Sequence, residues 1–182
     1  MATTKRLSEL EAVVLGLVRV DGPCTAYAVR KTVQTSLSTQ WSGSAGAVYP
    51  AVARLEQRGL LRLRAQSTGR RRSQALEITA KGSRALIDWL GPPVDPVALD
   101  IPADPLRTRL RFVELLPPAH QSSFLGEAID AVEATVRRVR ADVLRTTRAG
   151  ESPFKIAMAR GALHATRARL RTLQELKATL TA

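Results

Sequence analysis

The strongest constraint on the fold is a pair of short alternating segments around a basic loop. LLRLRAQ (60–66) and QALEITA (74–80) each alternate apolar and polar residues with period two, which is typical of half-buried strands. Between them lies STGRRRS (67–73), a glycine-containing loop with three consecutive arginines. The pattern predicts a two-stranded hairpin with a positively charged tip.

Helical periodicity surrounds this hairpin, because apolar residues recur three and four positions apart. The segments with this spacing are LSELEAVVLGLVRV (7–20), TAYAVRKTVQTSL (25–37), GAVYPAVARLEQRGLL (46–61) and KGSRALIDWL (81–90). The resulting order is helix, helix, helix, strand, strand, helix. It predicts a mainly α fold with a small β-hairpin wing, a winged helix-turn-helix.

Local signals place some of the ends of these helices. Thr25 is an expected N-cap for the second helix, and Gly59 is the expected residue that ends the third. TQWSGSAG (39–46) is polar and contains glycine, so we expect a loop there.

A proline cluster divides the chain. GPPVDPVALDIPADP (91–105) holds five of the ten prolines, and proline both removes backbone donors and disfavours helix before it. We therefore predict three parts: a winged-helix domain at 1–91, a Pro-rich linker at 92–104 and a helical dimerisation domain at 105–182.

The last part contains three helical patterns. PLRTRLRFVELL (105–116) is followed by long helices at about 118–147 and 153–181. Their apolar residues form narrow seams that need a partner helix, so we expect the helices to pack on each other and on a second subunit. The residues expected to serve dimerisation are Leu125, Ile129, Val132, Val136, Val139, Val143, Leu163, Leu170 and Leu173.

The charge balance favours a polyanionic partner. Lys and Arg total 28 against 16 Asp and Glu, which gives a formal net charge of +12. Such a field attracts nucleic acid or an acidic membrane surface. A surface that is basic only for solubility is the alternative.

The third helix carries the most specific signal. At 100° per residue, Val48, Ala51, Val52 and Leu55 form one apolar stripe. On the opposite side, the side chains are small and uncharged where the helix begins, and longer side chains with polar ends follow. This arrangement suits close approach to a DNA major groove. The residues expected on this side or flanking it are Gly46, Tyr49, Pro50, Arg54 and Gln57.

The arginines of the hairpin tip, Arg70, Arg71 and Arg72, are candidates for contacts with DNA phosphates. Contacts of this kind supply affinity and register but little sequence information.

Three stretches resemble the PadR family of bacterial transcriptional regulators: GPCTAYAVRKTV, GSAGAVYPAVARLEQRGLL and TGRRRSQALEITAKGSRAL. The resemblance implies a homodimeric DNA-binding repressor that acts on an inverted-repeat operator and responds to a small molecule or stress. It also implies DNA contacts by Tyr27, Lys31 and Ser44, in addition to Tyr49 and the wing arginines.

Two alternatives stay open at this point. One is a winged helix that binds other proteins, and the other is an architectural nucleic-acid-binding protein without an operator. Trp41, Trp89 and Phe112 are the aromatic residues able to line an effector pocket, with core packing as the alternative for Trp89.

No catalytic, metal-binding or cofactor-binding pattern is expected. His120 and His164 are the two histidines, and neither has a carboxylate or cysteine at metal-ligand spacing. Cys24, the single cysteine, stands beside a proline where a helix starts. A lowered thiol pKa with redox sensing is one hypothesis, and a turn residue without special reactivity is the favoured alternative. One cysteine and no signal peptide predict a cytoplasmic, nucleoid-associated protein.

Overall fold

The computed structural model describes residues 6–68 and 71–181, with the backbone alone described for 66–68, 71–73 and 181. The chain divides into two compact units, one up to Asp100 and one from Ile101. No helix in the described residues is long and apolar enough to cross a bilayer.

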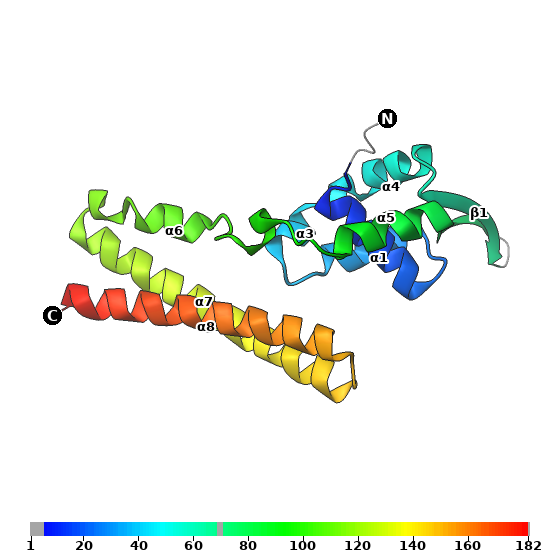
Figure 1. The fold of residues 1–182 in the computed structure, drawn as a ribbon. Helices are drawn as coiled ribbons and strands as arrows, with labels where there is room; N and C mark the ends of the chain where they lie inside the picture. Colours follow the sequence, from blue (N-terminus) through cyan, green and yellow to red (C-terminus); the bar gives the residue numbers. More distant parts are fainter. Residues whose placement is uncertain (1–5, 69–70, 182) are drawn as a thin grey trace. The chain divides into compact units, whose positions relative to one another are not determined.

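Unit 1 is a winged helix, as the sequence predicts (Figure 1). Four helices and a short 3-10 turn precede one antiparallel hairpin, and a fifth helix follows it. The elements are α1 (Glu9–Asp21), α2 (Ala26–Gln34), α3 (Thr39–Gly43), η1 (Ala45–Ala47), α4 (Val48–Gln57), β1 (Leu61–Thr68), β2 (Arg71–Ile78) and α5 (Ala80–Leu90). A 3-10 turn, η2 (Pro96–Leu99), lies in the proline-rich stretch that follows.

Side-chain caps fix where these helices begin. Ser8 and Glu11 form a reciprocal capping box at α1, and Thr25 caps α2 by accepting the amide of Ala28, as predicted. Gly59 has φ +69°, and its amide donates to the Glu56 carbonyl at 2.8 Å. It ends α4 in the conformation that glycine adopts without strain.

The core of unit 1 joins all its long helices to the hairpin. Val48, Ala51, Val52 and Leu55 of α4 are all buried, which confirms the predicted apolar stripe. They belong to one cluster with buried residues of α1, α2, α5 and both strands. Burial of this kind is the main stabilising contribution to a small domain. It also fixes which side of α4 faces outward.

Two local predictions were wrong. Residues 67–73 are not a long loop, because β1 and β2 pair as far as Thr68 and Arg71. The strand pairing continues through polar residues, since backbone hydrogen bonds do not depend on apolar alternation. Residues 39–43 form α3 rather than a loop, with Ser38 as N-cap and the Ser44 hydroxyl donating to the Gln40 carbonyl at 2.6 Å.

Unit 2 consists of two long helices preceded by short turns. Its elements are α6 (Pro105–Leu110), η3 (Val113–Leu115), α7 (Pro118–Arg148) and α8 (Pro153–Thr181). Helices α7 and α8 lie side by side as a hairpin of helices (Figure 1) and start and end within a residue of the predicted positions. The predicted helix at 105–116 is broken, because the chain leaves helical geometry at Phe112.

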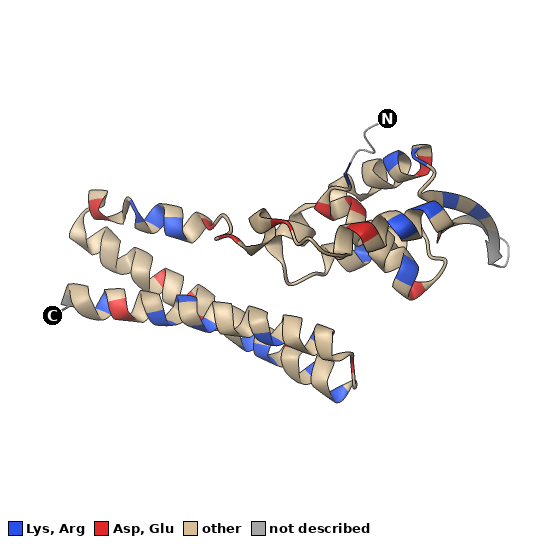
Figure 2. Ribbon diagram, in the orientation of Figure 1, with Lys and Arg blue, Asp and Glu red and all other residues tan. Residues whose placement is uncertain are grey.

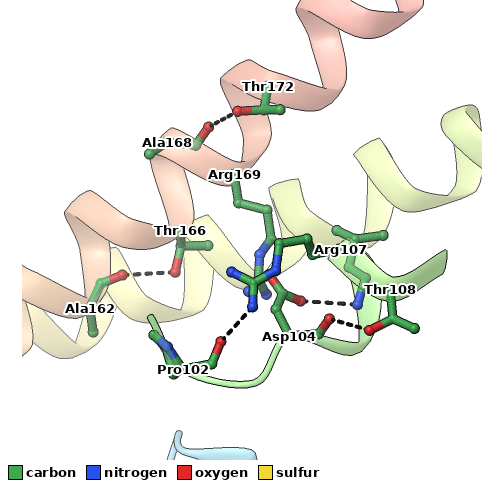
Figure 3. A network of polar contacts seen from close by, with 10 residues as sticks. Pro102, Asp104, Arg107, Thr108, Ala162, Thr166, Ala168, Arg169 and Thr172 are labelled. Carbon is green, nitrogen blue, oxygen red and sulfur yellow. Dashed lines mark hydrogen bonds and ion pairs between the residues drawn. The ribbon is translucent and has the colours of Figure 1, made fainter. Parts of the chain in front are cut away.

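A polar network holds the start of α6 against α8 (Figure 3). The Asp104 carboxylate caps α6 by accepting the Leu106 amide at 3.0 Å, and it also accepts from Arg169 at 2.7 Å. Arg107 donates to the Pro102 carbonyl at 3.1 Å. Partial burial raises the pKa of Asp104, but the backbone hydrogen bonds and Arg169 outweigh it, so the net pKa is lowered. The network therefore stabilises the charged carboxylate.

Candidate nucleic-acid interface

The outer side of α4 is uncharged and open. Tyr49, Pro50, Ala53 and Gln57 are exposed, opposite the buried stripe. In the described part of the chain, Tyr49 and Gln57 make no side-chain hydrogen bond, and a Cβ added at Gly46 would meet nothing within 4 Å. Packing within the chain therefore does not require a glycine at position 46. An approaching molecule would benefit from them, since they let the backbone come close.

Arg54, predicted to face DNA, is partly engaged within the chain. Its Nε donates to Glu11 Oε1 at 3.1 Å, while its side chain stays about half exposed. The other oxygen of Glu11 accepts from Arg58 Nη1 at 3.0 Å and from the Ser8 amide at 3.1 Å. The sequence pattern did not predict this role of Glu11. The Ser8-x-x-Glu11 capping spacing was readable, but the reach from α1 to α4 was not.

Glu11 is a nearly buried carboxylate, 5% exposed. Burial raises its pKa, but the Ser8 amide, the Arg54 hydrogen bond and the charges of Arg58 and Arg54 outweigh this, so the net pKa is lowered. A buried carboxylate with this many donors is held in one orientation. Glu11 therefore links α1 to Arg54 in α4 and to Arg58 at the C-cap of that helix.

Helix α2 adds a second exposed patch. Tyr27 is 62% exposed and Lys31 is exposed one turn later, so both lie on the same side of the helix. Ser44, also implied as a DNA contact, is only half-exposed, and its hydroxyl donates to the Gln40 carbonyl. Its oxygen can still accept a hydrogen bond.

Lys and Arg recur along the hairpin (Figure 2). Arg70 lies outside the described residues, and for Arg71 and Arg72 only the backbone is described, in β2 opposite Thr68 and Ser67. Nearer the core, Arg62 forms a two-pronged ion pair with Glu77, at 3.0 and 2.8 Å. This pair raises the pKa of Arg62 and lowers that of Glu77. Because Glu77 offsets its charge, Arg62 is less available to a phosphate.

The three aromatic residues considered for an effector pocket differ in their surroundings. Trp41 packs on the core of unit 1, and its Nε1 donates to Glu9 at 3.4 Å. Trp89 is 42% exposed on α5. Phe112 lines an open groove of about 350 Å³ within unit 2, together with Thr108, Arg109, Val113, Leu116 and Phe124.

The surroundings of Cys24 do not favour a reactive thiolate. Its amide and carbonyl pair with Leu76 of β2, so its backbone extends the sheet as a single bridge. Burial and the charge of Asp21 raise the pKa of the thiol, and the hypothesis of a lowered pKa is wrong. In the described residues, no three His, Cys, Asp or Glu side chains gather as a metal site.

The residues assigned to dimerisation lie on α7 and α8, which pack against each other within the chain. Leu125, Val139, Leu163 and Leu173 are buried there, and the other predicted residues are half-buried. The contact within the chain thus accounts for their apolar character. Their role in binding a second subunit stays a prediction.

Residues 14–88 match the model of the transcriptional regulator PadR-like family. No curated protein sequence matches the chain. The structure resembles Bacillus subtilis PadR in complex with operator DNA, with a TM-score of 0.81, 18% identity and coverage of 97% of this chain and 99% of that one.

It also resembles a PadR-like transcriptional regulator from Bacillus cereus, with a TM-score of 0.78, 18% identity and coverage of 98% and 99%. A third similar structure is Bacillus subtilis PadR in complex with p-coumaric acid, with a TM-score of 0.74, 18% identity and coverage of 95% and 99%. At such identities the structures support the shared fold, and the family match covers the winged helix. Residues 14–88 thus carry a winged helix that matches the PadR-like family of transcriptional regulators, and the whole chain shares the fold of the PadR structures.

Proposed function

We propose that the chain represses transcription by binding an inverted-repeat operator as a homodimer, with α4 in the major groove. The observation that carries this proposal is the outer side of α4, where Tyr49 and Gln57 stand exposed beside small residues. Gln57 can contact base edges, and Tyr49 can reach an edge or a phosphate. Tyr27 and Lys31 of α2 would contact the backbone nearby. The protein would then act on the cytoplasmic nucleoid.

Bacillus subtilis PadR, which shares this fold, is described in complex with operator DNA. A homodimer would present two copies of α4 about 34 Å apart, one turn of DNA, which suits an inverted repeat. The tip arginines Arg70, Arg71 and Arg72 would contact the flanking phosphates.

A second seam on α8 is suited to the second subunit. Besides the residues that face α7, this helix carries an exposed uncharged row with 4-3-4-3-4 spacing, the repeat of a helix-packing surface. Phe154 is 86% exposed and Met158 is 68% exposed, although both are apolar. The row consists of Phe154, Met158, Gly161, Ala165, Ala168 and Thr172. We propose this row as the dimer contact, because the seam between α7 and α8 is already used.

The open groove beside Phe112 in unit 2 is the candidate effector site. Its volume of about 350 Å³ is in the range of small-molecule pockets. Phe112 and Phe124 supply apolar walls, and Arg109 supplies a cation for an acidic group. Bacillus subtilis PadR is described in complex with p-coumaric acid. We propose a small, mainly apolar acid as effector. Such an acid should raise the melting temperature of the parent protein, and Arg109→Gln should abolish this shift.

A gel-shift competition tests DNA binding. The labelled probe is the duplex upstream of the protein's own gene, and the competitors are the same duplex and random duplex without label. We expect the unlabelled specific duplex to compete far better than random duplex. Equal competition would indicate an architectural protein without an operator, and no shift at all would favour a winged helix that binds proteins.

A further inference from the structure

Arg54 lies in α4 and Arg58 is the C-cap residue of this helix. One carboxylate from another helix binds both arginines. Glu11 of α1 accepts Arg54 Nε at 3.1 Å and Arg58 Nη1 at 3.0 Å. Its own side chain is 7% exposed, so the carboxylate is shielded from water and held in place by the Ser8 amide.

This arrangement sets the charge that α4 presents to DNA. Opposite the core stripe, α4 exposes the uncharged residues Pro50, Ala53 and Gln57. Beside them are the exposed Glu56 and the two arginines that Glu11 binds. Cations bind phosphates of any sequence, whereas hydrogen-bonding side chains distinguish bases. If Glu11 binds the arginines of a helix in the major groove, the helix loses affinity for phosphates of any sequence. It keeps the contacts of its uncharged side chains with the bases.

We propose that Glu11 is a specificity-determining residue that acts through Arg54 and Arg58: by binding their guanidinium groups, it limits their contact with DNA phosphates and so lowers affinity for random DNA relative to the operator. The inference rests on the proposed DNA binding by α4. Glu11 itself does not touch DNA in this account; it is a positioning residue.

A merely structural role for Glu11 predicts the opposite effect of mutation. Loss of a fold-stabilising carboxylate would weaken binding to every DNA, or reduce the active fraction of protein, and neither effect changes how affinity depends on salt. Release of arginines toward phosphates would strengthen binding to random DNA. It would also steepen the plot of log affinity against log salt, by about 0.9 per added phosphate contact.

The test compares full-length parent, Glu11→Gln and Glu9→Gln by fluorescence anisotropy with a short duplex of random sequence over a range of salt. Glu9 is a matched control because it lies on the same helix and its loss changes the net charge equally. Glu9 accepts hydrogen bonds from Gln40 and Trp41, not from arginine. Circular dichroism confirms that each variant is folded at the assay temperature.

We expect Glu11→Gln to steepen the salt slope by about 1 to 2 and to raise affinity for random DNA about fivefold or more near 0.1 M salt. We expect Glu9→Gln to change neither quantity appreciably. In an Arg54→Ala background, the effect of Glu11→Gln should shrink by at least about half, because Arg54 is one of the two arginines that Glu11 binds.

An unchanged salt slope in Glu11→Gln would overturn the proposal, and so would an equal change in Glu9→Gln, which would indicate a general charge effect. If the parent protein binds the operator but Glu11→Gln does not steepen the salt slope, this inference alone is refuted. Parent protein that binds no duplex refutes the proposed function, and the inference with it.

Discussion

Gly82 of α5 lies directly against the carbonyl oxygen of Leu60: a Cβ built at Gly82 would stand 2.1 Å from that oxygen. The backbone of α5 thereby touches the turn that joins α4 to β1. In the same region, the Thr79 hydroxyl donates to the Gly59 carbonyl at 2.8 Å and Lys81 Nζ donates to the Arg58 carbonyl at 2.8 Å. The end of α4 is thus fixed by backbone contact as well as by its core stripe.

Gly82→Ala should therefore destabilise the protein, because the added methyl group meets backbone that cannot rotate away. We expect the free energy of unfolding to fall by about 2–4 kcal/mol. The measurement is urea unfolding followed by circular dichroism. Gly16→Ala is the matched control: nothing lies within 4 Å of a Cβ at this position of α1. It should be neutral or stabilise by up to about 1 kcal/mol. Equal effects of the two changes would contradict the close contact.

Substitution of Arg70, Arg71 and Arg72 by Ala should weaken binding to specific and random DNA alike. Each arginine that contacts a phosphate contributes about 0.9 to the slope of log affinity against log salt, so the slope should flatten by about 2 to 3. The matched control is the triple Ala variant of Arg160, Arg167 and Arg171. It removes the same charge from exposed positions of α8. If both triple variants flatten the slope equally, the tip has no special role.

Gln57→Ala should change sequence preference more than overall affinity. A side chain that reads a base contributes about 1–3 kcal/mol of discrimination, so affinity for the operator should drop roughly 5- to 150-fold. Affinity for random duplex should stay within about twofold of the parent. Gln174→Ala, at another exposed position, serves as control. An equal loss with operator and random duplex would remove Gln57 from base recognition.

The stability of the parent should decrease in acid, partly through Glu11. Its pKa in the folded protein is lowered from the ordinary value of 4.5, so its contribution is present above that value and is lost as the pH falls through the folded pKa. Urea unfolding between neutral pH and pH about 3 measures this loss. Glu11→Gln should lose less stability over the same window, because it has no carboxylate to protonate there. A parallel decline in both proteins would show that the carboxylate contributes nothing.

The elements that could be predicted are those that a local pattern of residues along the sequence is enough to identify. The stripe of Val48, Ala51, Val52 and Leu55 was predictable because helical period alone determines which side is apolar. The ends of α7 and α8 were predictable because prolines and Gly150 interrupt an otherwise continuous pattern. These signals are local and need no knowledge of packing.

What the sequence could not predict depends on which segments meet. The contact of Glu11 with Arg54 spans 43 positions, and no spacing rule connects them. The wing is longer than its apolar alternation because backbone pairing continues through polar residues. The seam residues of α7 look alike whether they meet α8 of the same chain or another subunit, so periodicity alone could not distinguish the two.

The exposed row on α8 gives the sharpest test of the assembly. Helices that pack by a row with 4-3-4-3-4 spacing bury each member against the partner, so charges placed there oppose association. Met158→Glu combined with Ala165→Glu should convert a dimeric parent into a monomer, measured by size-exclusion chromatography with light scattering. Gln174→Glu adds a carboxylate to another exposed position of α8 and should leave the dimer intact. Because two α4 helices must reach one inverted repeat together, the monomer should also bind the operator much more weakly, with steeper dependence on protein concentration. A variant that remains dimeric would place the subunit contact elsewhere on the chain.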